Sequence, residues 1–227
     1  MEFNRALAAV RRGVHAVVGW VCAAPGTYIW LFILWANSRA LAEMPDHVRD
    51  WFLLSNSTNL VGLFHNPVWV LVVSAFWTEK PSFLLWLVAF HVFHVPAERL
   101  LGTRRWLAVV VCSHVGATLV SQYLVWVGIR THTVAHSRAF TIDIGVSYAI
   151  AGVAAVLAYR VPARLRWVYL AAVLAYFSVP LVTSHTFTDF GHFSAALIGL
   201  ACYPLTRGAE AEPAERRSRS AAGSAAG

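Results

Sequence analysis

The chain has 227 residues, of which 58% are hydrophobic and only 13% are charged. Soluble domains of this length rarely combine such fractions with a mean hydropathy of +0.59, so the composition excludes an ordinary soluble protein and indicates a polytopic membrane protein. The apolar runs are continuous rather than alternating, which favours helices over a transmembrane β-barrel.

Six apolar runs predict membrane-spanning helices, so the expected fold class is an all-α, six-helix transmembrane bundle. The predicted spans are 17–36, 82–96, 107–128, 143–159, 167–182 and 191–205. The first run stays apolar as far as Trp35, which is longer than the apolar core of a signal peptide. We therefore expect it to be a retained helix.

Two other segments are expected at the membrane surface. The apolar stretch 67–77 is ended by the polar run 78–81, which favours a re-entrant or interfacial segment. Within the connection 37–66, residues 46–54 have helical spacing and a Trp/Phe face, typical of a helix lying along a membrane. The predicted organisation is a cytoplasmic N-terminus (1–13), one membrane domain (14–206) and a disordered cytoplasmic tail (207–227).

The positions of Lys and Arg predict the orientation of the bundle. Of 18 basic residues, 13 lie in the N-terminus, the tail and the loops after the second and fourth spans, against 5 on the other side. This asymmetry predicts a multi-pass protein of the cytoplasmic membrane with both termini in the cytoplasm. The net charge of +7 then follows from topology, so no nucleic-acid partner is expected.

A serine and a histidine are expected at the same depth near the outer face. Ser147 follows Asp143 by four residues and His192 follows Asp189 by three, which places them about 6 Å and 5 Å below the helix starts. Both helices carry small residues that let backbones approach closely in lipid. These are Gly145, Ala149, Gly152 and Ala155 in one helix and Gly191, Ala195 and Gly199 in the other.

This pattern has a catalytic and a structural interpretation. Ser147 and His192 fit a nucleophile and its general base, but a serine in a membrane helix commonly bonds the carbonyl four residues earlier. Asp189 either orients His192 or, as we prefer, stabilises the start of the last helix. His114, within the third span, is expected to bond a neighbouring helix.

A metal site is the less favoured alternative at the outer face. Several residues there are possible zinc ligands: His132, His136, Asp143, His185, Asp189 and His192. Their spacing matches no metal motif, and the three cysteines all fall inside apolar spans, where they form no disulfide framework. We therefore expect a solvated polar rim, with no metal and no cofactor.

Three motifs resemble those of the rhomboid intramembrane serine proteases. The run 145–152 (GVSYAIAG) resembles the fourth-helix Gly-x-Ser-Gly segment, and 191–199 (GHFSAALIG) resembles the sixth-helix histidine motif. The run 98–105 (ERLLGTRR) is similar to the Glu-Arg-x-x-Gly stretch after the second helix. The order of the motifs matches that family along the whole membrane domain.

The resemblance implies a central fourth helix and a Ser147/His192 dyad that hydrolyses other transmembrane proteins near the outer ends of their spans. It also implies oxyanion support around the serine from Gly145, Val146 and Tyr148. Tyr148 replaces the second glycine of the motif. The oxyanion His-x-x-x-Asn pair would fall near Ser82 and Trp86, which supply neither group.

The rival hypothesis is therefore a catalytically inactive rhomboid-like protein that binds transmembrane helices. A transporter ranks third, because the spans hold few acidic residues and show no inverted repeat.

Overall fold

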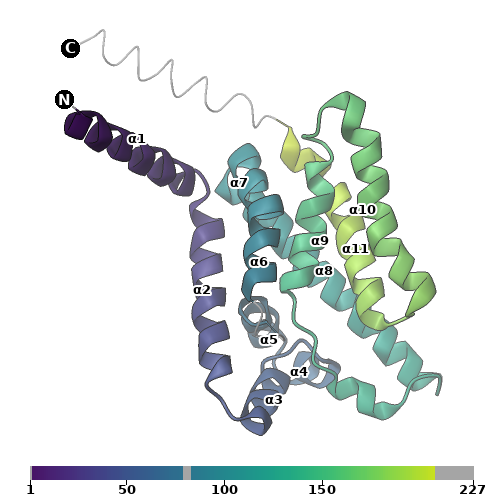
Figure 1. Ribbon diagram of the computed structural model, residues 1–227. Helices are drawn as coiled ribbons and strands as arrows, with labels where there is room; N and C mark the ends of the chain where they lie inside the picture. Colours follow the sequence, from purple (N-terminus) through teal and green to yellow (C-terminus); the bar gives the residue numbers. More distant parts are fainter. Residues whose placement is uncertain (1, 79–82, 208–227) are drawn as a thin grey trace, which may run out of the picture.

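The computed structural model describes residues 2–78 and 83–207, and all regular structure in this part of the chain is helical. The first half contains α1 (Glu2–Cys22), α2 (Pro25–Ala42), α3 (Asp46–Ser55), α4 (Leu60–His65), α5 (Pro67–Val73), the 3₁₀ turn η1 (Ser74–Phe76), α6 (Phe83–Ala89), the π-helical turn η2 (Phe90–His94) and α7 (Val95–Leu101). The second half contains α8 (Thr103–Arg130), η3 (His136–Phe140), α9 (Val146–Leu157), α10 (Ala163–Thr183), α11 (Phe187–Ala201) and η4 (Tyr203–Thr206). Figure 1 shows α2, α6, α9 and α10 standing side by side.

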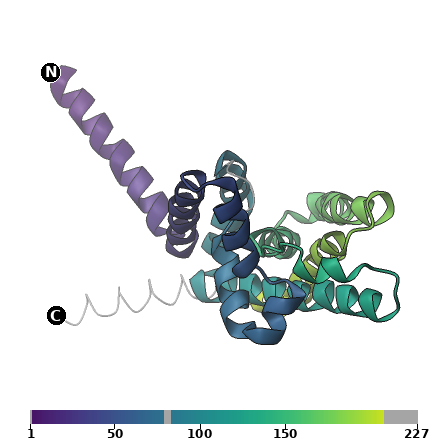
Figure 2. The same cartoon turned by 90° about the horizontal axis from the view of Figure 1, so that it is seen from below.

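The expected continuous first span, 17–36, is wrong. The chain bends by 90° between α1 and α2, so that α1 extends away from the bundle (Figures 1 and 2). Pro25 is the first residue of α2, and proline disfavours a helical conformation for the residue before it. The apolar composition continues across this break, which is why hydropathy alone joined the two helices.

Glu98 of α7 fixes the start of α2. Its carboxylate accepts the backbone N–H groups of Gly26 at 2.9 Å and Thr27 at 2.6 Å, together with the Thr103 hydroxyl at 2.8 Å. The first N–H groups of a helix have no acceptor within the helix, so a buried carboxylate from another helix replaces the missing N-cap. This contact gives a physical role to the glutamate of the 98–105 motif.

Three described helical segments are long and apolar enough to cross a membrane: Phe83–Leu101, Thr103–Arg130 and Ala163–Thr183. The bent pair α1–α2 raises that number to four if it is counted as one span. α9 and α11 are shorter, with 12 and 15 residues, so they extend only about 18 and 22 Å. The protein is therefore an all-helical, multi-pass membrane protein.

The expected second helix contains a widened turn. Segment 83–101 runs through α6, η2 and α7, and Pro96 lies just after the π-helical turn. Because proline has no N–H and displaces the preceding carbonyl, a wider turn accommodates it without breaking the span.

The core lies where α8, α9 and α11 pack together. α9 is buried over ten of its twelve residues, and it contacts α8, α10, α11 and η2. A Cβ at Gly199 of α11 would lie within 2.7 Å of the Gly152 Cα, so only glycine permits this approach. The small-residue pattern therefore predicted the α9–α11 contact.

The surface segments agree with the sequence in their local structure. α3 covers the expected helix 46–54, and 67–77 forms the short helix α5 followed by η1. Their positions relative to a bilayer remain predictions. Of the expected tail, only Arg207 belongs to the described residues.

Candidate active site

The start of α9 is held in place by a distant turn. The Ser57 hydroxyl accepts the Asp143 backbone N–H at 2.6 Å, and the Asp143 carbonyl accepts the Thr58 N–H at 3.0 Å and the Thr58 hydroxyl at 2.9 Å. These residues are buried. The connection between α3 and α4 therefore fixes the position from which α9 begins.

The Asp143 side chain joins the same start to α8. Its carboxylate accepts hydrogen bonds from Gln122 at 2.9 Å and Ser121 at 3.3 Å. A buried carboxylate needs such donors, because burial without them costs several kcal/mol. Asp143 is thus a structural anchor, in keeping with the expectation that it suits the start of this helix.

Gly145 is the N-cap of α9 and lies directly against His114 of α8. A Cβ at position 145 would overlap the imidazole ring, so the glycine is required for this contact. The Nε2 atom of His114 also lies 2.7 Å from the Leu71 carbonyl oxygen of α5. The expected bond from His114 to a neighbouring helix is confirmed.

Ser147 and Tyr148 occupy the first turn of α9 but face different directions. Ser147 is half-buried, whereas Tyr148 is fully buried and packs on Gly191 of α11. The Tyr148 hydroxyl lies among Ser121, Asp143 and Thr188. The phenol ring thus fills the crossing of α9 and α11, beside the proposed nucleophile.

His192 lies in the second turn of α11, because that helix begins at Phe187, earlier than the sequence predicted. Its imidazole meets the Tyr148 ring edge-on at a centroid distance of 5.0 Å and stacks on Phe177 of α10 at 6.1 Å. Among the described residues, no hydrogen bond joins His192 to Ser147. Two aromatic rings thus set the orientation of the imidazole.

Asp189 forms a capping box with Thr186 at the start of α11. The Asp189 carboxylate accepts the Thr186 N–H at 2.9 Å, and the Thr186 hydroxyl accepts the Asp189 N–H at 3.2 Å. Partial burial raises the pKa of Asp189, but hydrogen bonds from Thr186 and the nearby His192 outweigh it, so the pKa lies below its ordinary value. The preferred interpretation of Asp189 as a helix-start acid is confirmed.

Neither expected oxyanion position of the second helix carries the His or Asn of the motif. Ser82 lies outside the described residues, and Trp86 is a half-buried residue of α6. His94 is fully buried and accepts the Trp106 indole N–H at 3.1 Å, near the opposite end of the bundle. The described part of the chain contains no cluster of three or more His, Cys, Asp or Glu side chains suited to a metal ion.

Two residues of the site were not found from the sequence. Phe177 stacks on His192, and Ser57 positions Asp143 from 86 residues away. Neither has a sequence signal, because Phe177 is one aromatic residue in an apolar helix and Ser57 lies in a polar connection.

The architecture, in which two helices pack through small residues, is that of a helical, multi-pass membrane protein. A comparison with known families identifies the family. A family model described as rhomboid-like protein matches residues 19–212, most of the chain. The chain therefore belongs to the rhomboid-like protein family. No match is found among curated proteins or among solved structures.

Proposed function

We propose that this protein is an intramembrane serine peptidase, with Ser147 as nucleophile and His192 as general base. The observation that carries the proposal is the packing of the first turn of α9 against the second turn of α11. There the ring centroids of His192 and Tyr148 lie 5.0 Å apart, and Tyr148 is the residue next to Ser147. Family membership and the required glycines at 145, 152, 191 and 199 support the same assignment.

In the proposed reaction, the Ser147 hydroxyl attacks the scissile carbonyl carbon while His192 takes its proton. His192 then gives this proton to the departing amine as the peptide C–N bond breaks. Water hydrolyses the resulting ester and restores the serine. The first-turn backbone N–H groups of α9 have no acceptor within the helix, so they are the donors proposed for the oxyanion.

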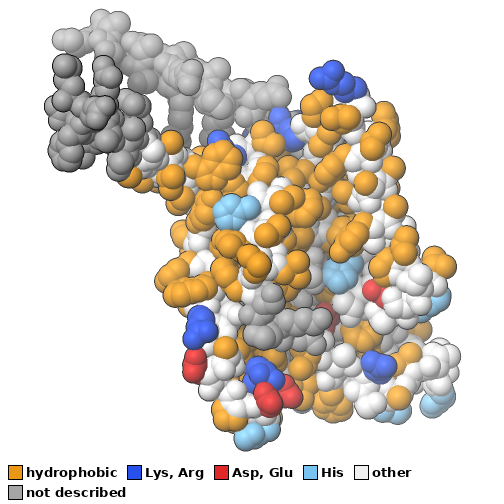
Figure 3. Space-filling model, in the orientation of Figure 1, with side chains coloured by type: hydrophobic (Ala, Val, Ile, Leu, Met, Phe, Trp, Pro, Cys, Tyr) orange, Lys and Arg blue, Asp and Glu red, His pale blue; other side chains and the backbone are white. Residues whose placement is uncertain are grey.

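The proposed topology has six crossings, with α9 as the central helix and both termini in the cytoplasm. On the face shown in Figure 3, basic side chains lie at both ends and the acidic ones lie in the lower half. Along the sequence, 13 of the 18 basic residues fall on the side of the two termini, which is the upper end in Figure 1. The positive-inside rule assigns the upper end to the cytoplasm. Ser147 and His192 then lie toward the outer end, where the proposed substrates are the spans of other membrane proteins.

The test is labelling of the purified protein by fluorophosphonate and isocoumarin probes. Wild-type protein should be labelled, whereas Ser147→Ala and His192→Ala variants should not. Ser194→Ala is the matched control, because Ser194 lies two residues from His192 and has no role in the proposed chemistry. Equal labelling of wild type and the Ser147→Ala variant would exclude the dyad.

One observation favours a second function, the binding of transmembrane helices without cleavage. Ser147 and His192 share no hydrogen bond among the described residues, and the Tyr148 ring occupies the adjacent space. A complete lack of labelling, combined with co-purification of other membrane proteins that persists in the Ser147→Ala variant, would support this function.

A further inference from the structure

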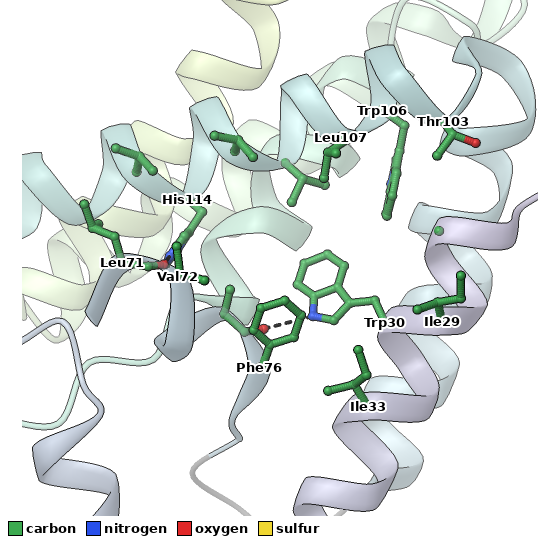
Figure 4. A pocket seen from close by; sticks show the side chains of 15 residues that line it. Ile29, Trp30, Ile33, Leu71, Val72, Phe76, Thr103, Trp106, Leu107 and His114 are labelled. Atoms are coloured by element: carbon green, nitrogen blue, oxygen red, sulfur yellow. Dashed lines mark hydrogen bonds between the residues drawn. The ribbon is translucent and has the colours of Figure 1, made fainter. Parts of the chain in front are cut away.

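A groove of about 420 Å³ lies between α2, the α5–η1 segment and α8 (Figure 4), and neither Ser147 nor His192 lines it. Its walls are almost entirely apolar. The most informative lining residues are Ile29 and Trp30 of α2, Val72 of α5, and Thr103, Val111 and His114 of α8.

The groove opens sideways, toward the surroundings of the bundle. Ile29 is 62% exposed, Val72 56% and Val111 49%, although each lines the groove. Two polar groups on the walls have hydrogen-bond partners: the Trp30 indole N–H donates to the Ala75 carbonyl at 2.9 Å, and His114 Nε2 lies 2.7 Å from the Leu71 carbonyl oxygen. An occupant must therefore be apolar along most of its length.

The dimensions of the groove select a single hydrocarbon chain over a helix. Thr103 and Val115 mark its ends along α8, and the 12-residue separation of these positions corresponds to about 18 Å. A volume of about 420 Å³ over that length gives a mean cross-section of about 23 Å². A helix about 10 Å wide has a cross-section of about 80 Å², so a whole helix does not fit inside the groove.

Basic side chains surround the Thr103 end. Arg104 is exposed in the first turn of α8 and shares a helix face with Leu107 and Val111, which line the groove. Arg99, on the neighbouring α7, lies 3.7 Å from the Trp20 ring centroid. The nearby Glu98 carboxylate is buried, so the exposed Arg99 and Arg104 side chains dominate the charge that this end presents to its surroundings.

We propose that this groove binds one acyl chain of an anionic phospholipid, with the headgroup beside Arg104 and the chain running along α8 toward His114. The chain already lies in an apolar bilayer, so van der Waals contact with the apolar walls provides its binding free energy. Arg104 provides the preference for a negatively charged headgroup.

The test uses nanodiscs containing phosphatidylglycerol with a photoreactive diazirine in its acyl chain, followed by mass-spectrometric mapping of the cross-links. Labelled peptides should map to the groove walls on α2, α5 and α8. α10 is the internal reference for ordinary lipid contact, because Val173 is the only buried residue of this fully described helix. Equal labelling per residue of α10 and the groove would overturn the proposal.

Variants separate the chain site from the headgroup site. Val111→Trp fills the groove and should lower its labelling about tenfold, whereas Leu119→Trp, equally exposed on α8 but outside the groove, should not. Arg104→Gln should reduce the preference for phosphatidylglycerol over phosphatidylcholine about fivefold. Leu107→Trp is a second groove-filling change. Unchanged labelling of the groove in both the Val111→Trp and the Leu107→Trp variant would contradict the proposal.

Discussion

Gly199 of α11 packs directly on the backbone of Gly152 of α9, and this contact brings together the two helices that carry the proposed dyad. Neither glycine adopts an unusual backbone angle, so their role is the close approach itself. The contact links the small-residue pattern of the sequence to the geometry of the site.

Gly199→Ala should separate α9 from α11. The new Cβ would meet the Gly152 backbone, which cannot move aside as a flexible side chain would. We expect a loss of about 1–3 kcal/mol in the free energy of unfolding, measured by denaturant titration in detergent micelles. Gly19→Ala, with nothing within 4 Å of its new Cβ, is the control. Equal effects of the two changes would refute a packing role.

Glu98→Gln should weaken the junction of α1 and α2. The amide keeps one acceptor oxygen but loses the charge and the second acceptor, so the Gly26 and Thr27 N–H groups cannot both be satisfied as well. The expected cost is about 1–3 kcal/mol in the free energy of unfolding. Glu43→Gln, in an exposed ion pair with Arg39, should cost less than about 1 kcal/mol. A similar loss of stability for Glu98→Gln and Glu43→Gln would show that Glu98 does not cap α2.

Ser57→Ala should loosen the start of α9. Its hydroxyl accepts the Asp143 N–H and donates to the Asp143 carbonyl at 3.1 Å, and both groups are buried. We expect a loss of about 1–3 kcal/mol in the free energy of unfolding and slower probe labelling of Ser147. Ser55→Ala removes only an exposed bond to the Trp51 carbonyl and should change neither. Unchanged labelling of the Ser57→Ala variant would show that the contact between Ser57 and Asp143 does not position the site.

The helical class and most helices follow from the sequence because long apolar runs need helices in lipid. The bend at Pro25 did not follow, because the residues on both sides of it are apolar. Glu98 could not be assigned to α2 for another reason: its partners lie 71 and 72 residues away, and only the fold brings them together.

The sequence predicted which two helices meet at the candidate site, but not how their side chains are arranged there. The Gly145-to-Tyr148 motif lies at the start of α9, whereas α11 begins at Phe187, four residues before the Gly191–His192 motif. However, α9 is apolar on all sides, so its hydrophobic pattern does not show which side of the helix faces which neighbour. The sequence therefore could not show that Tyr148, rather than Ser147, faces Gly191.

Tyr148 variants distinguish the role of its ring from that of its hydroxyl. Tyr148→Phe keeps the ring against His192 and should retain probe labelling, with a change in stability of about 1 kcal/mol or less. Tyr148→Ala empties the crossing of α9 and α11 and should cost about 3–5 kcal/mol in the free energy of unfolding. Tyr176→Ala, at a position 73% exposed on α10, is the control. Loss of labelling in the phenylalanine variant would instead assign chemistry to the hydroxyl.

The most direct measurement of the central claim is the position of the covalent adduct after fluorophosphonate treatment of the wild-type protein in nanodiscs. Peptide mass spectrometry should place the phosphonyl group on Ser147, and the His192→Ala variant should carry none while remaining folded. An adduct on any other serine, or an adduct on Ser147 formed equally well without the imidazole, would contradict a dyad mechanism.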